Sequence, residues 1–276
     1  MPNSMTEISP KFSPTGAPVL NVDDAGGKGL PVIFQHGLCG DARQTIEAFP
    51  QDPRFRRITI EARGHGGSEA GDPTLFSVRT FASDVAAFID AHRLAPIVVG
   101  GISMGAAIAL HLAVQRPGIV QGLILARPAW IAASAPANNI PNALVGRLLA
   151  ELSQEDARKA FEASEIARLL VEKAPDNLAS LRGFFSREPQ ATTAALLQAI
   201  AVDGPGVSEE DLRNLEIPTL IIGHDIDYIH PLSYAAAISQ LIPRSQLVLV
   251  TPKALSKTAY LKDFHTAVTN FLETFL

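Results

Sequence analysis

The pentapeptide at 101–105, Gly-Ile-Ser-Met-Gly, places a serine between an apolar run and a helix-forming stretch. The run at 97–99 is short and β-branched, as in buried strands, and residues 106–112 are mostly Ala, Ile and Leu. Glycines on both sides allow a tight strand-to-helix turn, so the hydroxyl of Ser103 would stand above the edge of a sheet. A serine placed in this way can attack a carbonyl carbon as a nucleophile.

This segment resembles the nucleophile elbow of the α/β-hydrolase superfamily, and the resemblance extends from about Pro31 to the C-terminus. It implies an α/β fold in which a mostly parallel central sheet is flanked by helices. The sequence agrees with this fold, because short apolar runs recur with helix-like stretches between them. Turn residues around 19–22 add an antiparallel hairpin at the sheet edge. The expected strands of the sheet are at 32–34, 58–60, 97–99, 123–125, 220–222 and 247–250.

A second loop would supply hydrogen-bond donors for the oxygen of the attacked carbonyl group. Residues 35–40, Gln-His-Gly-Leu-Cys-Gly, directly follow the expected strand at 32–34. The His-Gly pair resembles the oxyanion loop of the superfamily, which implies that the backbone N–H groups of Leu38 and Met104 stabilise the oxyanion. A glycine-rich turn without this role is the alternative interpretation.

Three basic residues near these turns are expected to hold loops in place. Residues 61–69 resemble the R-G-H-G-x-S segment that follows the next strand in the superfamily. Its glycines allow a tight chain reversal, and Arg63 and His65 would hold neighbouring loops by hydrogen bonds. His36 is expected to brace the oxyanion loop and is also a candidate for contact with the substrate.

The loop that follows the expected strand at 220–222 offers two carboxylates. In the superfamily, an acid at this position orients the catalytic base. Asp227 is the preferred candidate because it stands four residues before Pro231, as the acid of the superfamily commonly stands before its proline. Asp225 is the second candidate, and solvated turn residues are the alternative for both.

The base is missing from its usual position. In the superfamily it is a histidine in the loop after the last strand, but residues 250–258 contain none of the seven histidines of the chain. A serine hydroxyl without a base is a poor nucleophile at neutral pH. We take His230 as the candidate base, because it shares a loop with Asp227 and could reach the serine if that loop folds inward.

Other bases remain open alternatives. His265 falls on an apolar helical face, so it is expected to pack against the sheet. Lys253 or Lys257 would act as a base only if burial lowered the pKa of its ammonium group greatly. The absence of any triad base is a further alternative.

Arg127 ends the expected strand at 123–125, at the sheet edge where open α/β sheets bind ligands. Its guanidinium would hold a substrate carboxylate through two hydrogen bonds, or would form an ion pair with Glu61 or Asp227. Trp130 follows closely and would form a wall of the substrate pocket or pack in the core. The expected partner is therefore a small-molecule substrate, with a carboxylate if Arg127 contacts it.

Strand-like runs are missing between residues 130 and 217, where stretches rich in Ala, Leu, Glu and Arg indicate helices. Loop compositions at 135–141 and 203–206 mark the ends of this insertion. By the resemblance it is the helical cap that lies over the active site, and a separate helical module is the alternative. The predicted organisation is an α/β-hydrolase core of residues 1–130 and 213–276 with a cap insertion of residues 131–212.

The composition narrows the class of protein. Of the 276 residues, 47% are hydrophobic and 18% are charged, which is typical of a globular protein with a full core. The net charge is −5 and the basic residues form no run, so no nucleic-acid surface is expected. No segment reaches the roughly 20 apolar residues that span a membrane, and residues 1–17 lack a signal-peptide pattern. One cysteine, Cys39, excludes an internal disulfide and is compatible with a cytoplasmic protein.

The sequence therefore predicts a serine hydrolase that acts on a small ester, lactone or related acyl substrate. Ser103 would attack the carbonyl group, and Asp227 would orient His230 as the base. No metal-ligand cluster or dinucleotide-binding glycine pattern is visible in the sequence, so no cofactor is expected. A lyase-type enzyme on the same scaffold and a ligand-binding protein without turnover are the two alternatives.

Overall fold

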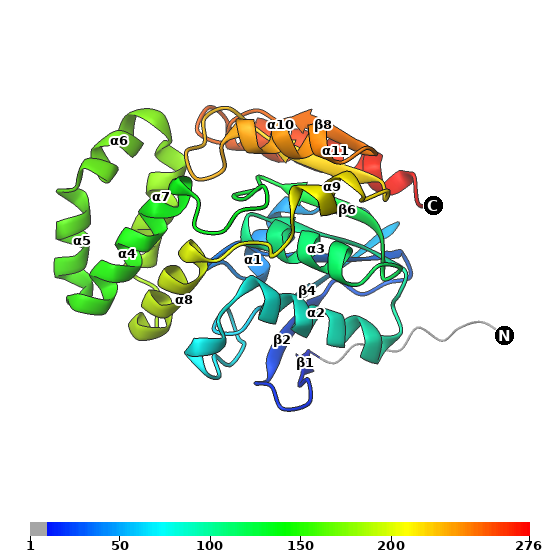
Figure 1. Cartoon of the computed structure of the whole chain (residues 1–276), viewed down its shortest axis with the longest axis horizontal. Helices are drawn as coiled ribbons and strands as arrows, with labels where there is room; N and C mark the ends of the chain where they lie inside the picture. Colours follow the sequence, from blue (N-terminus) through cyan, green and yellow to red (C-terminus); the bar gives the residue numbers. More distant parts are fainter. Residues whose placement is uncertain (1–9) are drawn as a thin grey trace.

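The computed structural model describes residues 10–276 and is built around one eight-stranded sheet (Figure 1). The strand order is β1-β2-β4-β3-β5-β6-β7-β8, with antiparallel pairing at β1–β2 and β2–β4 and parallel pairing elsewhere. The predicted mostly parallel sheet and its antiparallel edge are confirmed. Residues 1–9, part of the segment searched for a signal peptide, lie outside the described residues. The strands are β1 (Lys11–Phe12), β2 (Leu20–Asp24), β3 (Leu30–Gln35), β4 (Phe55–Ile60), β5 (Ile97–Ile102), β6 (Val120–Ala126), β7 (Thr219–Gly223) and β8 (Ser245–Leu249).

Helices connect the strands and make up most of the segment between β6 and β7. Two short 3-10 helices, η1 and η2, precede α2 and α4 respectively. The bounds are α1 (Ala42–Ala48), η1 (Pro73–Leu75), α2 (Val78–His92), α3 (Met104–Gln115), η2 (Ala137–Asn139), α4 (Ile140–Glu151), α5 (Gln154–Glu162), α6 (Glu165–Lys173), α7 (Pro175–Phe184), α8 (Gln190–Val202), α9 (Glu209–Arg213), α10 (Leu232–Leu241) and α11 (Lys257–Glu273).

Both faces of the sheet are buried, because alternate side chains of each strand pack under different helices. On β3, Ile33 belongs to a buried cluster that includes residues of α2, α3 and α10. Its neighbours Val32 and Phe34 belong to a second cluster, with Phe49 and the apolar face of α11. Helix α3 is apolar nearly all round, as expected for a helix that begins at the middle of a sheet and is covered on every side.

Helices α4–α8 form a third buried cluster at one end of the molecule (Figure 1). Phe161 and Leu181 are among its fully buried members, and Ile229, from the loop after β7, packs into it. This inserted group of helices is therefore in contact with a loop that follows a strand of the central sheet. The boundaries given above for the core and the cap stay a prediction.

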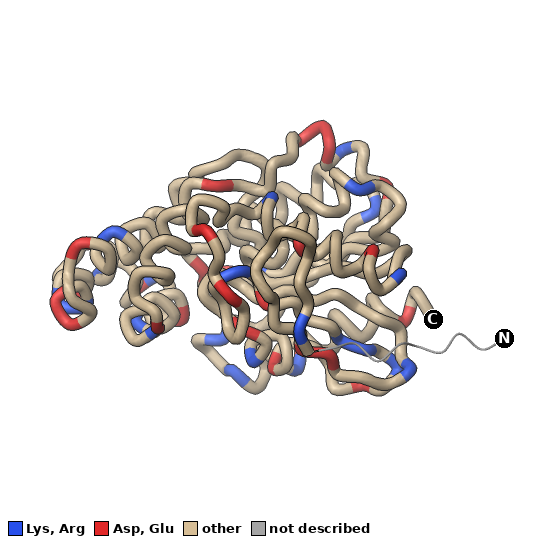
Figure 2. The backbone as a smooth tube through the Cα atoms, turned by 90° about the horizontal axis from the view of Figure 1, so that it is seen from below, with Lys and Arg blue, Asp and Glu red and all other residues tan. Residues whose placement is uncertain are grey.

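The described surface carries charges of both signs. Figure 2 shows Lys and Arg interspersed with Asp and Glu along the chain. Across residues 10–276, no helix combines the length and the apolar character that a membrane crossing requires. The expectation that the chain binds no nucleic acid stays a prediction.

The turn between β5 and α3 has no space for side chains at its two glycines. A Cβ atom on Gly105 would lie 2.3 Å from the backbone oxygen of Gln35, and one on Gly101 would lie 2.6 Å from the same oxygen. The end of β3 therefore packs directly against the start of α3. This close approach brings the loop after β3 next to Ser103.

We expect Gly105→Ala to lower the free energy of unfolding by about 1–3 kcal/mol, because the added methyl group must displace backbone atoms. The matched control is Gly183→Ala in α7, where a Cβ atom would meet no heavy atom within 4 Å. That change should be neutral or stabilising by up to about 1 kcal/mol, because Ala favours helix over Gly. Urea unfolding of the three proteins measures both effects, and an unchanged midpoint for Gly105→Ala would contradict the packing described.

Candidate active site

Ser103 lies between β5 and α3 in a backbone conformation that is rare for a residue with a side chain. Its φ is +56° and its ψ is −111°. Its N–H donates to the oxygen of Ala126 on β6 at 2.9 Å, and its own oxygen accepts from the N–H of Ala107 at 3.1 Å. A neighbouring strand and the first turn of α3 thus hold the strained residue. Its side chain forms no helix cap and is left available to other groups.

The loop after β7 brings Asp227 and His230 to this serine. The Nε2 atom of His230 lies 2.8 Å from the Oγ atom of Ser103. The Nδ1 atom of the same ring lies 2.9 Å and 3.0 Å from the two carboxylate oxygens of Asp227. The structure therefore brings together the serine, the histidine and the carboxylate that the sequence singled out. Histidine and acid come from one loop, three residues apart.

Burial and charge set the protonation of this pair. Burial acts to raise the pKa of Asp227, but the charges of Arg127 and His230 outweigh it and hold that pKa well below its usual range. Burial lowers the pKa of the His230 ring; Asp227 opposes this, and the charge of Arg127 adds to it. At neutral pH the pair is thus a carboxylate and a neutral imidazole. In that state Nδ1–H donates to Asp227 and Nε2 accepts the serine proton.

Two asparagines outside the β-sheet hold this loop. The Oδ1 atom of Asn177, in α7, accepts hydrogen bonds from the N–H groups of Tyr228 at 2.7 Å and Ile229 at 3.0 Å. The Nδ2 atom of Asn138, in η2, donates to the oxygen of Ile229 at 2.6 Å. Within the loop, the N–H of His230 donates to Asp227 at 3.0 Å. The inserted segment between β6 and β7 therefore helps to position the histidine.

The loop after β3 presents a free backbone donor beside the serine. The N–H of Gly37 donates to Oε1 of Gln44 at 2.6 Å, and the N–H of Cys39 donates to Nε2 of His65 at 3.0 Å. Between them, the N–H of Leu38 has no acceptor among residues 10–276. Met104 is the first residue of α3, so its N–H has no partner within the helix. The two donors proposed from the sequence are thus free to bind an oxygen atom.

A cavity of about 80 Å³ lies beside these groups. Core and inserted helices both contribute to its wall. The residues that line it are Gly37, Leu38, Gln44, Ile102, Ser103, Arg127, Asn142, Asn177, Ser180, Leu181, Phe184, Ile229 and His230.

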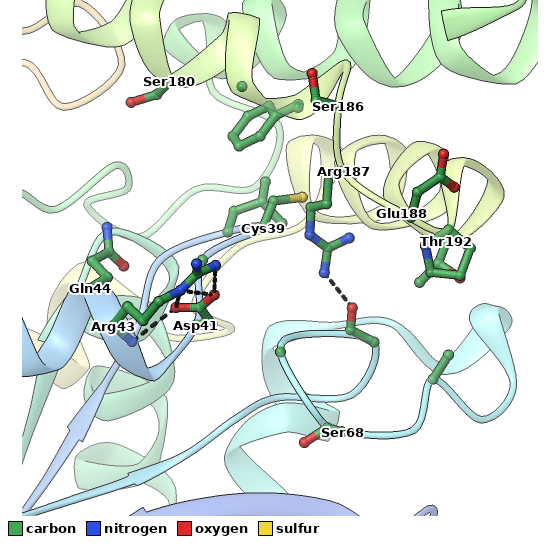
Figure 3. Close-up of a pocket in the computed structure, with 18 residues that line it drawn as sticks. Cys39, Asp41, Arg43, Gln44, Ser68, Ser180, Ser186, Arg187, Glu188 and Thr192 are labelled. Carbon is green, nitrogen blue, oxygen red and sulfur yellow. Dashed lines mark hydrogen bonds and ion pairs between the residues drawn. The ribbon is translucent and has the colours of Figure 1, made fainter.

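A larger cleft of about 810 Å³ adjoins this cavity and is shown in Figure 3. The cavity and the cleft share Leu38, Gln44, Ser180 and Phe184 as lining residues. Cys39 also lines the cleft, and burial raises the pKa of its thiol to about 12. The sulfur is therefore protonated at neutral pH and is a weak nucleophile.

Arg127 is engaged by Asp227. Its Nε and Nη2 atoms lie 2.7 Å and 2.6 Å from the same carboxylate oxygen, and its side chain is only 13% exposed. Of the two interpretations of this arginine, the structure favours the ion pair. The guanidinium compensates the buried carboxylate and so fixes the acid that orients His230.

Two residues proposed for substrate contact lie elsewhere. Trp130 is buried, and its Nε1–H donates to the backbone oxygen of Asp203 at 2.9 Å, so its ring packs in the main core and not on the wall of the cavity. His36 is buried and accepts from the N–H of Ala62 through Nε2 at 3.1 Å. Neither ring lines the cavity or the adjoining cleft, so the structure agrees with the other expectations given for them, core packing for Trp130 and bracing for His36.

The contacts of Arg63, His36 and His65 agree with the prediction that these residues hold loops in place. The guanidinium of Arg63 makes two hydrogen bonds of 2.8 Å to Asp84 on α2. The rings of His36 and His65 are in contact, with centroids 4.8 Å apart and a tilt of 41°, and burial lowers the pKa of both rings. These contacts tie the loops after β3 and β4 to each other and to α2.

The alternative catalytic residues, Asp225, Lys253, Lys257 and His265, do not line the cavity beside Ser103. Asp225 is exposed. Lys257 is exposed and pairs with Glu47 of α1. His265 does not pack against the sheet as expected; it lies on the surface of α11, where Nε2 contacts the backbone oxygen of Glu47 at 2.9 Å. These positions leave His230 as the histidine in contact with Ser103.

Sequence reasoning missed the residues that hold the two loops. Gln44 and Asn177 belong to no recognisable motif: Gln44 accepts from the backbone of Gly37 in the preceding loop, and Asn177 accepts from the backbone of a segment far along the chain. For the base, the useful sequence evidence was an absence: residues 250–258 have no histidine, and this made His230 the candidate. Across residues 10–276, no three His, Cys, Asp or Glu side chains come together as a metal-binding group.

Comparison with known proteins places the chain in a family. A family model described as the alpha/beta hydrolase fold matches residues 31–254, so the chain belongs to the α/β-hydrolase fold family. Among curated proteins, it is 27% identical over 268 residues to an sn-1-specific diacylglycerol lipase of Mus musculus, covering 90% of this chain and 82% of that protein. It is 28% identical over 236 residues to a 2-hydroxy-6-oxo-2,4-heptadienoate hydrolase of Pseudomonas putida, covering 82% of each.

Solved structures show the same fold. An esterase from Exiguobacterium antarcticum superposes with a TM-score of 0.73 at 21% identity, covering 96% of this chain and 99% of that one. An enol-lactonase from Burkholderia xenovorans superposes with a TM-score of 0.71 at 20% identity, covering 96% and 100%. At these identities the likeness establishes the architecture alone.

Replacing Arg127 should change the titration of His230. In Arg127→Gln we expect the pKa of His230 to rise, because a nearby positive charge that opposes protonation is removed while Asp227 remains. Arg127→Lys keeps the charge and should leave the pKa closer to that of the unmodified protein. NMR titration of the His230 ring protons in the three proteins measures this; an unchanged or lower His230 pKa in Arg127→Gln would be inconsistent with the described pair.

Removing the carboxamide of Asn177 should loosen the catalytic loop. Asn177→Ala leaves the buried N–H groups of Tyr228 and Ile229 without an acceptor, which costs about 1–3 kcal/mol of stability. Amide hydrogen exchange at 228 and 229 should become faster. Asn142→Ala is the control, because Asn142 is also buried but its amide bonds to Asn139. If both variants leave exchange at 228 and 229 unchanged, Asn177 does not hold the loop.

Proposed function

We propose that this chain is a serine hydrolase that cleaves a small ester, lactone or related acyl compound. The observation that carries the proposal is the contact from Ser103 Oγ to His230 Nε2 at 2.8 Å, continued from Nδ1 to Asp227 at 2.9 Å. In this arrangement an imidazole can activate a serine hydroxyl. Relatives with the names of lipases, from Mus musculus and Psychrobacter immobilis, support an acyl substrate.

The first half of the reaction forms an acyl-enzyme. His230 Nε2 takes the proton of Ser103 while Oγ bonds to the carbonyl carbon, and the carbonyl π electrons move to the oxygen. The imidazolium that forms is stabilised by the carboxylate of Asp227. The carbonyl then re-forms as the bond to the alcohol oxygen breaks, and His230 returns its proton to that oxygen.

The second half hydrolyses the acyl-enzyme. His230, neutral again, takes a proton from water as the water oxygen bonds to the same carbonyl carbon. The bond to Ser103 Oγ then breaks, and the proton returns from the ring to the serine oxygen. The products are a carboxylic acid and the free enzyme.

The backbone donors act on the oxygen atom that becomes negative in both halves. The N–H groups of Leu38 and Met104 have no acceptor in the described part of the chain, so they are available to this oxyanion. The contact of Gly37 with Gln44 and that of Cys39 with His65 fix the loop on both sides of Leu38. The donors are therefore held in position before the reaction, which avoids the cost of reorganising them.

We further propose that residues 131–212 act as a cap. Asn142, Ser180, Leu181 and Phe184, all from inserted helices, line the cavity beside Ser103. The cap would exclude water from the reacting carbonyl group and limit the size of its substituents. A cavity of about 80 Å³ next to the serine favours a small acyl group, with the remainder of the substrate in the adjoining cleft.

A fluorophosphonate probe tests the proposal. We expect stoichiometric labelling of the unmodified protein, none in Ser103→Ala, and a large loss in His230→Ala, because the base is needed to activate the hydroxyl. With a small ester such as p-nitrophenyl acetate, either change should reduce kcat/KM by about 1,000-fold or more. His265→Ala is the matched histidine control and should retain both labelling and hydrolysis.

The alternatives predict other results. A ligand-binding protein without turnover would show no labelling of Ser103 and no hydrolysis of any ester. A lyase-type enzyme in which the triad is not used would keep its activity in His230→Ala. Full labelling of His230→Ala would remove the role assigned to this histidine.

A further inference from the structure

Arg187 lies on the wall of the large cleft, between the inserted helices and the core. It follows α7, and its side chain reaches across to the loop after β4 (Figure 3). Its Nη2 atom donates to the backbone oxygen of Gly64 at 2.5 Å, and its Nη1 atom donates to Oγ1 of Thr193 at 2.8 Å. Both acceptors are neutral. These two hydrogen bonds hold the guanidinium in a fixed position, but neither acceptor carries a negative charge that would balance it.

No carboxylate among residues 10–276 forms an ion pair with Arg187. The neighbouring Glu188 accepts hydrogen bonds from Gln154 and from the N–H of Gln190, and Figure 3 shows its carboxylate directed away from the guanidinium. The other carboxylate on the cleft wall, Asp41, is bound by Arg43. Within the described part of the chain the guanidinium of Arg187 therefore has no ion-pair partner, although its side chain is half-buried.

The cleft leads to the serine. Leu38, whose N–H is one of the proposed oxyanion donors, lines both the cleft and the cavity beside Ser103, and so do Gln44, Ser180 and Phe184. A molecule with its carbonyl group at Ser103 can thus extend into the cleft toward Arg187. The N–H groups of the guanidinium that Gly64 and Thr193 do not use have no acceptor among the described residues.

We propose that Arg187 binds an anionic group of the substrate, so that the substrates are small esters with a carboxylate or phosphonate-like group remote from the scissile bond. The proposal rests on the serine hydrolase function given above and specifies its substrate class. A guanidinium matches such groups because its planar N–H donors bind two oxygens at once. Arg127, which pairs with Asp227, is not available for this task.

The test compares esters that differ only in charge. Monomethyl adipate carries a carboxylate, methyl adipamate carries a neutral amide of the same shape, and methyl 5-phosphonopentanoate carries the other anion. We expect the unmodified protein to prefer one or both anions over the amide. Arg187→Gln should lower kcat/KM for the preferred anion by about 10- to 100-fold and for the amide by less than about threefold.

Two further variants separate charge recognition from a structural role. Arg187→Lys keeps the positive charge but lacks the planar set of guanidinium N–H donors, so it should retain part of the preference for the anion. Arg182→Gln, which removes an arginine of α7 that pairs with Glu162, should keep the full preference. Equal losses on anion and amide in Arg187→Gln would show that Arg187 only ties the inserted helices to the core and would overturn the proposal. So would an unmodified protein that hydrolyses the amide as well as both anions.

Binding of free adipate tests the anion site without turnover. Calorimetry on the unmodified protein and on Arg187→Gln should show binding that the substitution weakens by about tenfold or more. Absence of binding, or equal binding by both, would overturn the anion site. Failure of the triad has a different signature, namely no fluorophosphonate labelling while adipate still binds in an Arg187-dependent manner.

Discussion

The buried carboxylate of Asp227 is the contact on which the arrangement of the site depends. It faces Arg127 on one side and His230 on the other, with a fully buried side chain. A carboxylate out of water is stable only if its charge is compensated, and the arginine at the end of β6 supplies that compensation. The ring of His230 can then stay neutral while Asp227 orients it, and its Nε2 atom is directed at Ser103. The end of β6 thus supports the site twice, through the oxygen of Ala126 that accepts from the Ser103 N–H and through Arg127, which directly follows the strand.

The site is assembled across the boundary between the central sheet and the inserted helices. The sheet provides the strained serine, whose position follows from the close packing of β3 against α3. The inserted segment provides Asn177 and Asn138, which hold the loop that carries the acid and the base. The same segment provides Arg187 on the cleft wall. Core and insertion are therefore mutually dependent in structure, because neither one positions all the polar groups.

The fold and the serine turn could be predicted from the sequence, because strand periodicity and glycine spacing are local properties. His230 was one of several open choices, since spacing does not say whether a loop folds inward. For Trp130 the sequence left a pocket wall and core packing open, because its closeness to a strand end does not reveal that its ring would donate to the backbone of Asp203. Asn177 acts between segments far apart in the chain, so no pattern in the sequence reveals it.

In the proposed triad the acid and the base share one loop, so the segment after β8 need not supply a catalytic histidine. The segment from 250 to 256, between β8 and α11, supplies no residue to the proposed triad, and it is held by structural contacts: the N–H and hydroxyl of Thr251 donate to Asp263. If the proposed pair performs the proton transfer, substitutions in this stretch act on stability through such contacts. We expect a short peptide inserted in this segment to be tolerated as long as α11 remains packed against the sheet.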